Sequence, residues 1–224
     1  MSSLNFSSKL GQHMEIIALG HSSFKLKGKN ASVVIDPYDY EMVGQRFPKH
    51  VTADLVLVTH EHKDHNNIKA IEPIDKQVVV FSHPGEYEVK DIEVFGIESF
   101  HDNKNGEERG KNTIYHISVD GINFVHLGDL GQSKLTDAQI DLLDSVDVLF
   151  IPVGGKYTID AFQAKEIINQ LEPLMVIPMH YKREGLSPVS FFTKEMGQEN
   201  IIPLPKIKIT KDSLPDKMQV VVLE

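Results

Sequence analysis

Residues 59–65 read Thr59-His60-Glu61-His62-Lys63-Asp64-His65 and directly follow the apolar run Leu55-Val56-Leu57-Val58. In a β-strand, residues i and i+2 point to the same side, so His60 and His62 at the end of this run can bind one metal ion. Asp64 and His65 come one turn later, where a change of chain direction can aim them at a second ion. Three imidazoles and a carboxylate suit zinc, iron or manganese. The stretch therefore predicts a metal site, with two ions as the preferred interpretation.

Further segments carry a lone Asp or His behind a strand-like run. Asp36 ends Val33-Val34-Ile35-Asp36-Pro37, and His101 ends Gly96-Ile97-Glu98-Ser99-Phe100-His101. Asp129 lies in Phe124-Val125-His126-Leu127-Gly128-Asp129-Leu130, and His180 lies in Val176-Ile177-Pro178-Met179-His180-Tyr181. With His-x-His-x-Asp-His at residues 60–65, this order resembles the signature of the metallo-β-lactamase superfamily, over nearly the whole chain.

Two more segments narrow the resemblance, namely Gly20-His21-Ser22-Ser23-Phe24 and Pro152-Val153-Gly154-Gly155-Lys156-Tyr157-Thr158. With them the chain is most similar to the branch of predicted zinc-dependent hydrolases. That branch also contains ascorbate-phosphate lactonases and the phospholipase D that acts on N-acylethanolamine phospholipids. The substrates of its members are poorly defined, so the resemblance implies a hydrolase without naming a substrate.

The resemblance implies seven metal ligands in this chain. His60, His62 and His101 would hold a first ion, Asp64, His65 and His180 a second, and Asp129 would bridge both. The implied cofactors are two divalent ions, zinc first and manganese or iron as alternatives. A water bridging two such ions loses a proton near neutral pH and can act as the nucleophile.

Several neighbours of the ligands are expected to support the reaction. Asp64 would orient the bridging hydroxide as well as bind metal, and His21 is assigned to catalysis with it because its turn resembles a family feature lining the active-site mouth. Strand alternation turns His126 away from Asp129, which favours a supporting role over ligation. Asp36 resembles the family residue that braces the ligand loop by hydrogen bonds. For His83, in Ser82-His83-Pro84-Gly85, we expect a turn residue, with a site role left open.

The pattern of apolar residues predicts layered α and β structure. Strand-like segments dominate up to Leu127, and helices are expected at Thr136–Leu143, Thr158–Leu171 and Pro188–Met196. Lys206–Thr210 and Met218–Leu223 are expected to form a terminal strand pair. Strand–helix alternation puts helices outside packed sheets. The resemblance sharpens this to an α/β fold, the four-layer αββα sandwich, with its site in loops at one sheet edge. The polar segment His101–Lys111 starts at a candidate ligand and could act as a substrate lid.

Composition limits the remaining alternatives. A chain of 224 residues, 41% hydrophobic, can bury one large core, and we expect one domain over residues 1–224 with a polar leader at 1–12. No run approaches the ~20 apolar residues of a membrane span, and the leader lacks the apolar stretch of a secretory signal, so a cytoplasmic protein is expected. The absence of cysteine leaves nitrogen and oxygen as ligands, and the net charge of −9 argues against nucleic acid as a partner. Oligomeric state stays open, a homo-oligomer included.

The preferred function is metal-dependent hydrolysis of a small ester, lactone, amide or phosphoester. Arg183 follows His180 by three residues, and Lys156 and Tyr157 follow a Gly-Gly turn, so both segments could favour an anionic small-molecule substrate. The alternative for these residues is a solvated surface. Two other functions remain: an iron-dependent oxidoreductase on the same scaffold, and a non-catalytic metal-binding protein.

Overall fold

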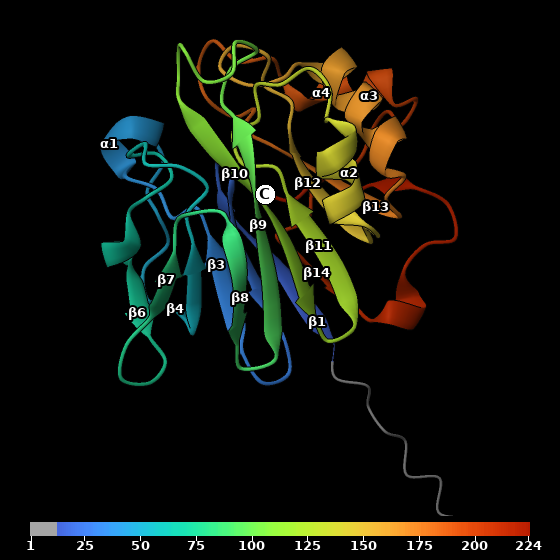
Figure 1. Ribbon diagram of the computed structural model, residues 1–224. Coiled ribbons are helices and arrows are strands. Elements are labelled where there is room, and N and C mark those ends of the chain that lie inside the picture. Colours follow the sequence, from blue (N-terminus) through green and yellow to red (C-terminus); the bar gives the residue numbers. More distant parts are fainter. Residues whose placement is uncertain (1–12) are drawn as a thin grey trace, which may run out of the picture.

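The structure is a computed structural model that describes residues 13–224; the predicted leader, residues 1–12, lies outside the described residues. Two large β-sheets form the middle of the fold (Figure 1). The first has the strand order β14-β1-β2-β3-β5-β7. Its strands are β1 (Met14–Gly20), β2 (Ser23–Lys27), β3 (Ser32–Ile35), β5 (Leu55–Leu57), β7 (Val79–Phe81) and β14 (Lys206–Ile209).

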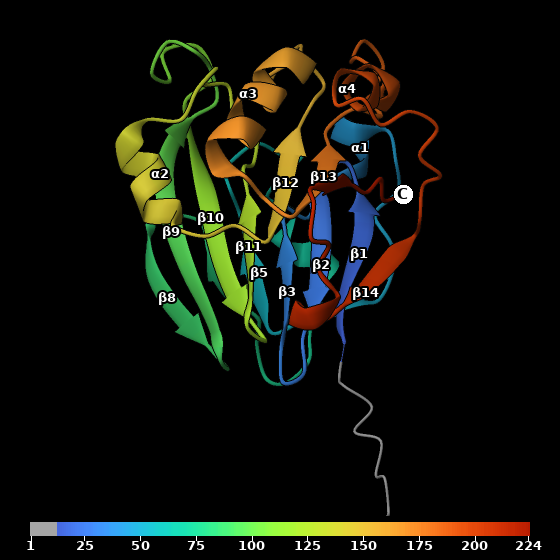
Figure 2. The ribbon, with the colours of Figure 1, turned by 90° about the vertical axis from the view of Figure 1, so that its right-hand side faces the viewer.

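The second sheet has the order β15-β13-β12-β11-β10-β9-β8. Its strands are β8 (Gly85–Val89), β9 (Ile92–Phe100), β10 (Lys111–Val119), β11 (Ile122–His126), β12 (Val148–Pro152), β13 (Met175–Met179) and β15 (Gln219–Val220). Strands β11, β12 and β13 run parallel, so their carboxyl ends meet at one edge of the sheet. In Figure 2 the arrows of β12 and β13 point to this upper edge.

Outer layers cover both sheets, which gives the expected αββα sandwich. Helices α2 (Asp137–Leu143), α3 (Ala161–Leu171) and α4 (Val189–Glu195) cover the second sheet. The outer layer over the first sheet is thinner, and it includes β4 (Val51–Ala53), β6 (Ile71–Pro73) and the 3-10 helix η1 (Ile68–Ala70). Helix α1 (Tyr40–Val43) is a single turn that buries none of its residues.

Strand alternation explains how the apolar residues divide between layers. In β5, Leu55 and Leu57 pack between the two sheets, whereas Val56 packs on the outer side of the first sheet. On the second sheet, Phe150 of β12 faces the inter-sheet core and Leu149 faces the helices. Because both faces of these strands are buried, their sequences read as continuous apolar runs. Within residues 13–224, no helix is long and apolar enough to cross a membrane.

Two expectations about elements are corrected. The terminal strands do not pair with each other: β14 pairs antiparallel with β1 in the first sheet, and β15 pairs parallel with β13 in the second. The 3-10 helix η2 (Lys211–Ser213) lies between them. Helix α3 begins at Ala161 rather than Thr158, because the Asp160 carboxylate accepts hydrogen bonds from the backbone N–H groups of Phe162 and Gln163 and so caps the helix there.

Candidate metal centre

The residues expected to bind metal come from segments far apart in sequence and meet at one edge of the sandwich. His60 to His65 follow β5, and His101 follows β9. Asp129 and His180 follow the parallel strands β11 and β13. Asp129 is their common neighbour. Its Oδ2 lies 3.2 Å from Nε2 of His180, 3.3 Å from Nε2 of both His65 and His101, and 4.0 Å from Nε2 of His60.

These distances match donors that share an ion. Two ligands at zinc bond lengths and tetrahedral angles lie about 3.4 Å apart. The donors fall into overlapping groups whose ligand atoms all lie within 4.8 Å of one another. A first group contains His60, His62 and His101; a second contains His21, Asp64, His65 and His180; Asp129 lies with His60 and His65 between them.

The polar atoms of this cluster lack protein partners. Among residues 13–224, six buried side-chain nitrogens and oxygens of the cluster make no hydrogen bond: Nε2 of His21, His60 and His65, Nδ1 of His101 and His180, and Oδ1 of Asp129. Each buried, unsatisfied polar atom costs about 1–3 kcal/mol. Divalent metal ions would satisfy Nε2 of His60 and His65, which lie 4.0 and 3.3 Å from Oδ2 of Asp129, so these donors fit the ions that the motif predicts. His101 and His180 turn Nε2, and not the unpartnered Nδ1, toward the same carboxylate.

Asp36 orients the second group from behind, as the sequence predicted. Its Oδ2 lies 2.8 Å from Nδ1 of His65 and accepts a 2.7 Å hydrogen bond from the Thr59 hydroxyl, while its Oδ1 accepts the Thr59 backbone N–H at 2.8 Å. A carboxylate on one imidazole nitrogen fixes the ring and leaves the other nitrogen to bind metal. Nε2 of His65 is thereby directed at Asp129.

Gly128 and Asn112 hold Asp129 in place. The buried Asn112 accepts the backbone N–H of Asp129 at 3.0 Å and donates to the carbonyl of Leu127 at 2.9 Å. Gly128 has φ 57°, and a Cβ there would collide with the side chains of Asn112 and Thr59. Close packing therefore requires glycine at position 128, next to the carboxylate of Asp129.

Burial and mutual attraction decide the charges in the cluster. Burial lowers the pKa of His21 to about 4 and holds that of His60 well below its usual range. Burial alone would raise the pKa of the Asp129 carboxyl, but the imidazoles of His180 and His65 hold it well below its ordinary value. Near pH 7 the cluster thus offers the ionised Asp129 carboxylate beside neutral imidazoles at His21 and His60. Burial alone would lower the pKa of His65, but the carboxylates of Asp129 and Asp36 hold it well above its usual value, so a metal ion would bind this ring in exchange for a proton.

Asp64 links the second group to the opening of the site. Its Oδ2 lies 3.7 Å from Nε2 of His21 and 3.3 Å from Nη1 of Arg183. Burial alone would raise the pKa of this carboxyl, but the neighbouring imidazoles of His21 and His65 lower it below its usual range. Asp64 is therefore charged, partly buried and in reach of the cavity.

The other histidines differ in how their nitrogens are used. His126 is fully buried, with Nε2 at 2.9 Å from the carbonyl of Ser22 and Nδ1 accepting the backbone N–H of Gly128 at 3.1 Å. Both nitrogens are occupied, in agreement with a supporting role. His83 lies in an exposed turn, with Nδ1 3.1 Å from the Ser82 hydroxyl, and lines a side hollow of about 330 Å³ that also reaches His60 and His62.

A cavity of about 500 Å³ opens beside the cluster, and Asp64, His62 and Asp129 form part of its wall. Arg183 and Tyr157, both singled out in the sequence, line it as well. The sequence reasoning missed Arg109, which also lines the cavity and lies over the Tyr157 ring with its Cζ 5.8 Å from the centroid. The signal for Arg109 was its place in the polar loop that begins at His101.

That loop is folded around one carboxylate. Asp102 accepts four backbone N–H hydrogen bonds of 2.8–3.0 Å, from Lys104, Gly106, Glu108 and Arg109. Burial opposes the charge, but these four donors lower the pKa of Asp102 to about 2. The carboxylate thus fixes the backbone at Arg109 relative to His101.

Comparisons with known proteins agree with this geometry. Residues 15–180 match the family described as the beta-lactamase superfamily domain. A candidate Zn-dependent hydrolase of the metallo-β-lactamase superfamily from Thermotoga maritima has a similar structure, with a TM-score of 0.78 and 34% identity over 95% of this chain and 99% of that one. A UPF0173 metal-dependent hydrolase from Thermoplasma acidophilum is 30% identical over 76% of this chain and 84% of its own length. A UPF0173 protein from Pyrococcus abyssi is 27% identical over 86% and 95%.

Proposed function

The chain belongs to the metallo-β-lactamase superfamily, and from that premise we propose that it is a dinuclear metal-dependent hydrolase of small anionic substrates. The observation that carries the proposal is the convergence of four imidazole Nε2 atoms on the buried Asp129 carboxylate; among the described residues, those of His60 and His65 have no hydrogen-bond partner. Relatives named metal-dependent hydrolases support the same reaction class.

His60, His62 and His101 would hold one ion, Asp64, His65 and His180 the other, and Asp129 both. When bound, two zinc ions supply an activated water nucleophile and Lewis acidity for the developing oxyanion. Manganese or iron could occupy the same nitrogen and oxygen donors.

The side chains around the ligands would divide the remaining work. Asp64 is charged and lines the cavity, so its carboxylate can accept a hydrogen bond from the attacking water and orient it. Asp36 and Asn112 keep His65 and Asp129 in fixed orientations, so the donors need little rearrangement during turnover. We assign catalysis to the charged Asp64 and to its neighbour His21, whose burial keeps the imidazole neutral near pH 7.

The cavity favours a small anionic substrate. Its volume of about 500 Å³ is in the range of small-molecule sites. Arg109 and Arg183 line it, although the whole chain carries a net charge of −9. Arg183 uses one edge for Asp64 and keeps other N–H donors for a carboxylate or phosphate. The Tyr157 ring contacts two cations: Arg109, and Lys156 with its Nζ 5.1 Å from the ring centroid. The ring thus helps to hold the Arg109 guanidinium in place.

Metal analysis and turnover assays together test the proposal. Protein purified without added metal should contain zinc or manganese and bind two ions per chain at saturation. It should hydrolyse anionic lactones, esters or phosphodiesters faster than neutral analogues of equal size. A saturating stoichiometry of one ion would overturn the dinuclear centre, and iron with redox-active spectra and no hydrolysis would overturn the reaction class.

A further inference from the structure

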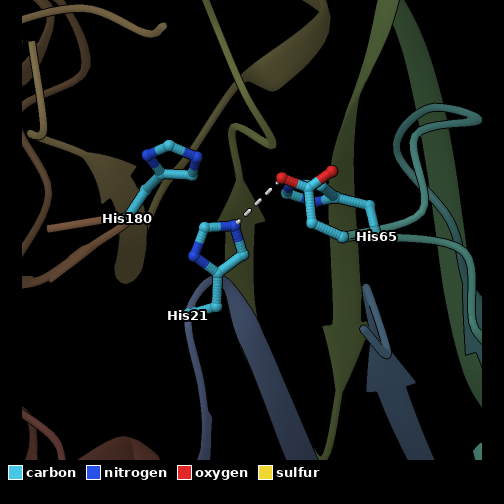
Figure 3. A group of neighbouring side chains, drawn as sticks. His21, His65 and His180 are labelled. Atoms are coloured by element: carbon cyan, nitrogen blue, oxygen red, sulfur yellow. Dashed lines mark ion pairs between the residues drawn. The ribbon is translucent and has the colours of Figure 1, made fainter. Parts of the chain in front are cut away.

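His21 lies at the second group but outside the ligand set that the motif predicts. It occupies the turn between β1 and β2, in the first sheet, and its side chain is only 1% exposed. Figure 3 shows its ring pointing into the space between His65 and His180, with a ring nitrogen directed at a carboxylate oxygen. The ring centroids lie 4.4 Å from His180 and 5.3 Å from His65.

The ring nitrogens of a buried structural histidine normally make hydrogen bonds, and His21 differs in this respect. Nε2 is buried and makes no hydrogen bond among the described residues, and its nearest acceptor, Oδ2 of Asp64, is 3.7 Å away. His126, equally buried, has both nitrogens engaged by backbone groups. A hydrogen-bonding role with Asp64 would shorten the 3.7 Å distance, whereas donors on a common ion stay near this separation.

The backbone at His21 is held in a costly conformation. His21 has φ 53° and His180 has φ 58°, both in the left-handed region that side chains with a Cβ rarely adopt. The N–H of His180 donates to the carbonyl of His21 at 3.3 Å, so the two residues fix each other across the two sheets. Strained residues of this kind persist where the surroundings require one side-chain position.

We propose that His21 is a ligand of the ion held by Asp64, His65 and His180, an assignment that rests on the metal-dependent function proposed above. The four ligand atoms lie within 4.8 Å of one another. With Asp129 added, the second group would supply five protein donors and the first group four.

This difference predicts distinct roles for the two ions. Four donors match the coordination that zinc prefers, and substrate can add to such an ion as a fifth ligand. Five protein donors leave little room for substrate and favour a metal that accepts five or six ligands, such as manganese or iron. The ion held by the first group would therefore bind the substrate oxygen, and the ion held by the second group would be the more tightly enclosed one.

Cadmium-113 NMR on the whole chain tests the assignment directly. Protein labelled with nitrogen-15 in its histidines is loaded with cadmium-113, and each ligating imidazole then shows a metal–nitrogen coupling. Six coupled histidines are expected, namely the five of the implied ligand set (His60, His62, His65, His101 and His180) and His21. His21→Asn is chosen because asparagine tolerates the left-handed region. It should lose one coupling and lower the affinity for the ion of the second group by more than about 100-fold. His83→Asn, an exposed turn residue near the cluster, is the control and should keep all six.

The outcomes separate the two proposals. Two bound ions with five coupled histidines in the wild type would overturn the role of His21 and leave the dinuclear centre intact. One bound ion or none would overturn both. Equal affinity for the second ion in wild type and His21→Asn would also overturn the ligand assignment.

Discussion

The two ligand groups use similar donors but are supported differently. In the first group, His60 and His101 are buried, while His62 is exposed and lines the cavity. In the second group, His65 is fully buried and tied to Asp36, and His180 is buried and hydrogen-bonded through its backbone to the turn of His21. Residues of both groups line the cavity, but only the second group is tied to Asp36 and to the turn of His21. Under the proposed function, this difference predicts that the first group admits substrate and the second stays fixed.

Removing the shared carboxylate should have the largest effect. Asp129 lies within 3.2–4.0 Å of imidazoles of both groups, so Asp129→Asn takes away the negative charge that both depend on. We expect turnover to fall by more than about 100-fold, since mutating even a residue that only supports a ligand lowers metal affinity or activity by about 10–100-fold. Metal content after dialysis should drop by at least one ion per chain. Full retention of both ions would mean that the two groups are independent of Asp129.

Removing the carboxylate that supports His65 in the second group should lower metal affinity less than removing Asp129. Asp36→Asn keeps a residue suited to the φ of 49° at this position but removes the charge that orients His65. We expect affinity for one of the two ions to fall by about 10–100-fold, with the other nearly unchanged. Calorimetric titration with zinc should resolve two classes of site in the variant. A parallel weakening of both ions would contradict the division into a fixed and an open side.

The sequence identified the residues that come together in both groups more readily than the residues that support them. His60, His62, Asp64 and His65 lie within six consecutive positions, so one local motif was enough to identify them. Arg109 reaches the cavity only because Asp102 folds its loop, a tertiary effect that residue types alone do not reveal. Likewise, the unpartnered nitrogen of His21 is a property of packing between two sheets.

The error at the carboxyl terminus has a physical reason too. Lys206–Thr210 and Met218–Leu223 both have strand-like apolar residues. Such a pattern indicates which face of a strand is buried, but it does not indicate which strand will be the hydrogen-bonded neighbour. In the structure each segment extends a different sheet, because β1 and β13 offered free edges there. Helix α2 was predictable because its Thr136 and Gln139 form a local capping box.

The loop beside the first group gives a prediction of stability against pH. Asp102→Asn removes the charge that four backbone N–H groups stabilise, and should lower the free energy of unfolding by about 2 kcal/mol near pH 7. The folded-state pKa of about 2 lies below the unfolded value near 3.9, so this stability is present above the unfolded pKa and is lost as pH falls through the folded one. Denaturant titrations of both proteins should therefore converge between about pH 4 and pH 2. A difference that stays constant over this range would rule out the charge as its cause.

The smallest expected effect concerns the substrate charge at the open side. Arg183→Ala and Arg109→Ala each remove one guanidinium from the cavity wall. For the anionic member of a matched substrate pair, kcat/KM should fall by about 10-fold, because one charge-assisted contact is lost, and the neutral member should change little. Arg183 also contacts Asp64, at 3.3 Å, so Arg183→Ala can disturb the second group, whereas Arg109 forms its ion pair with Glu108, which belongs to neither group. Arg109→Ala is therefore the cleaner probe of substrate charge. If it affects both substrates equally, the anionic preference is wrong, and if only Arg183→Ala has an effect, its role is to hold Asp64.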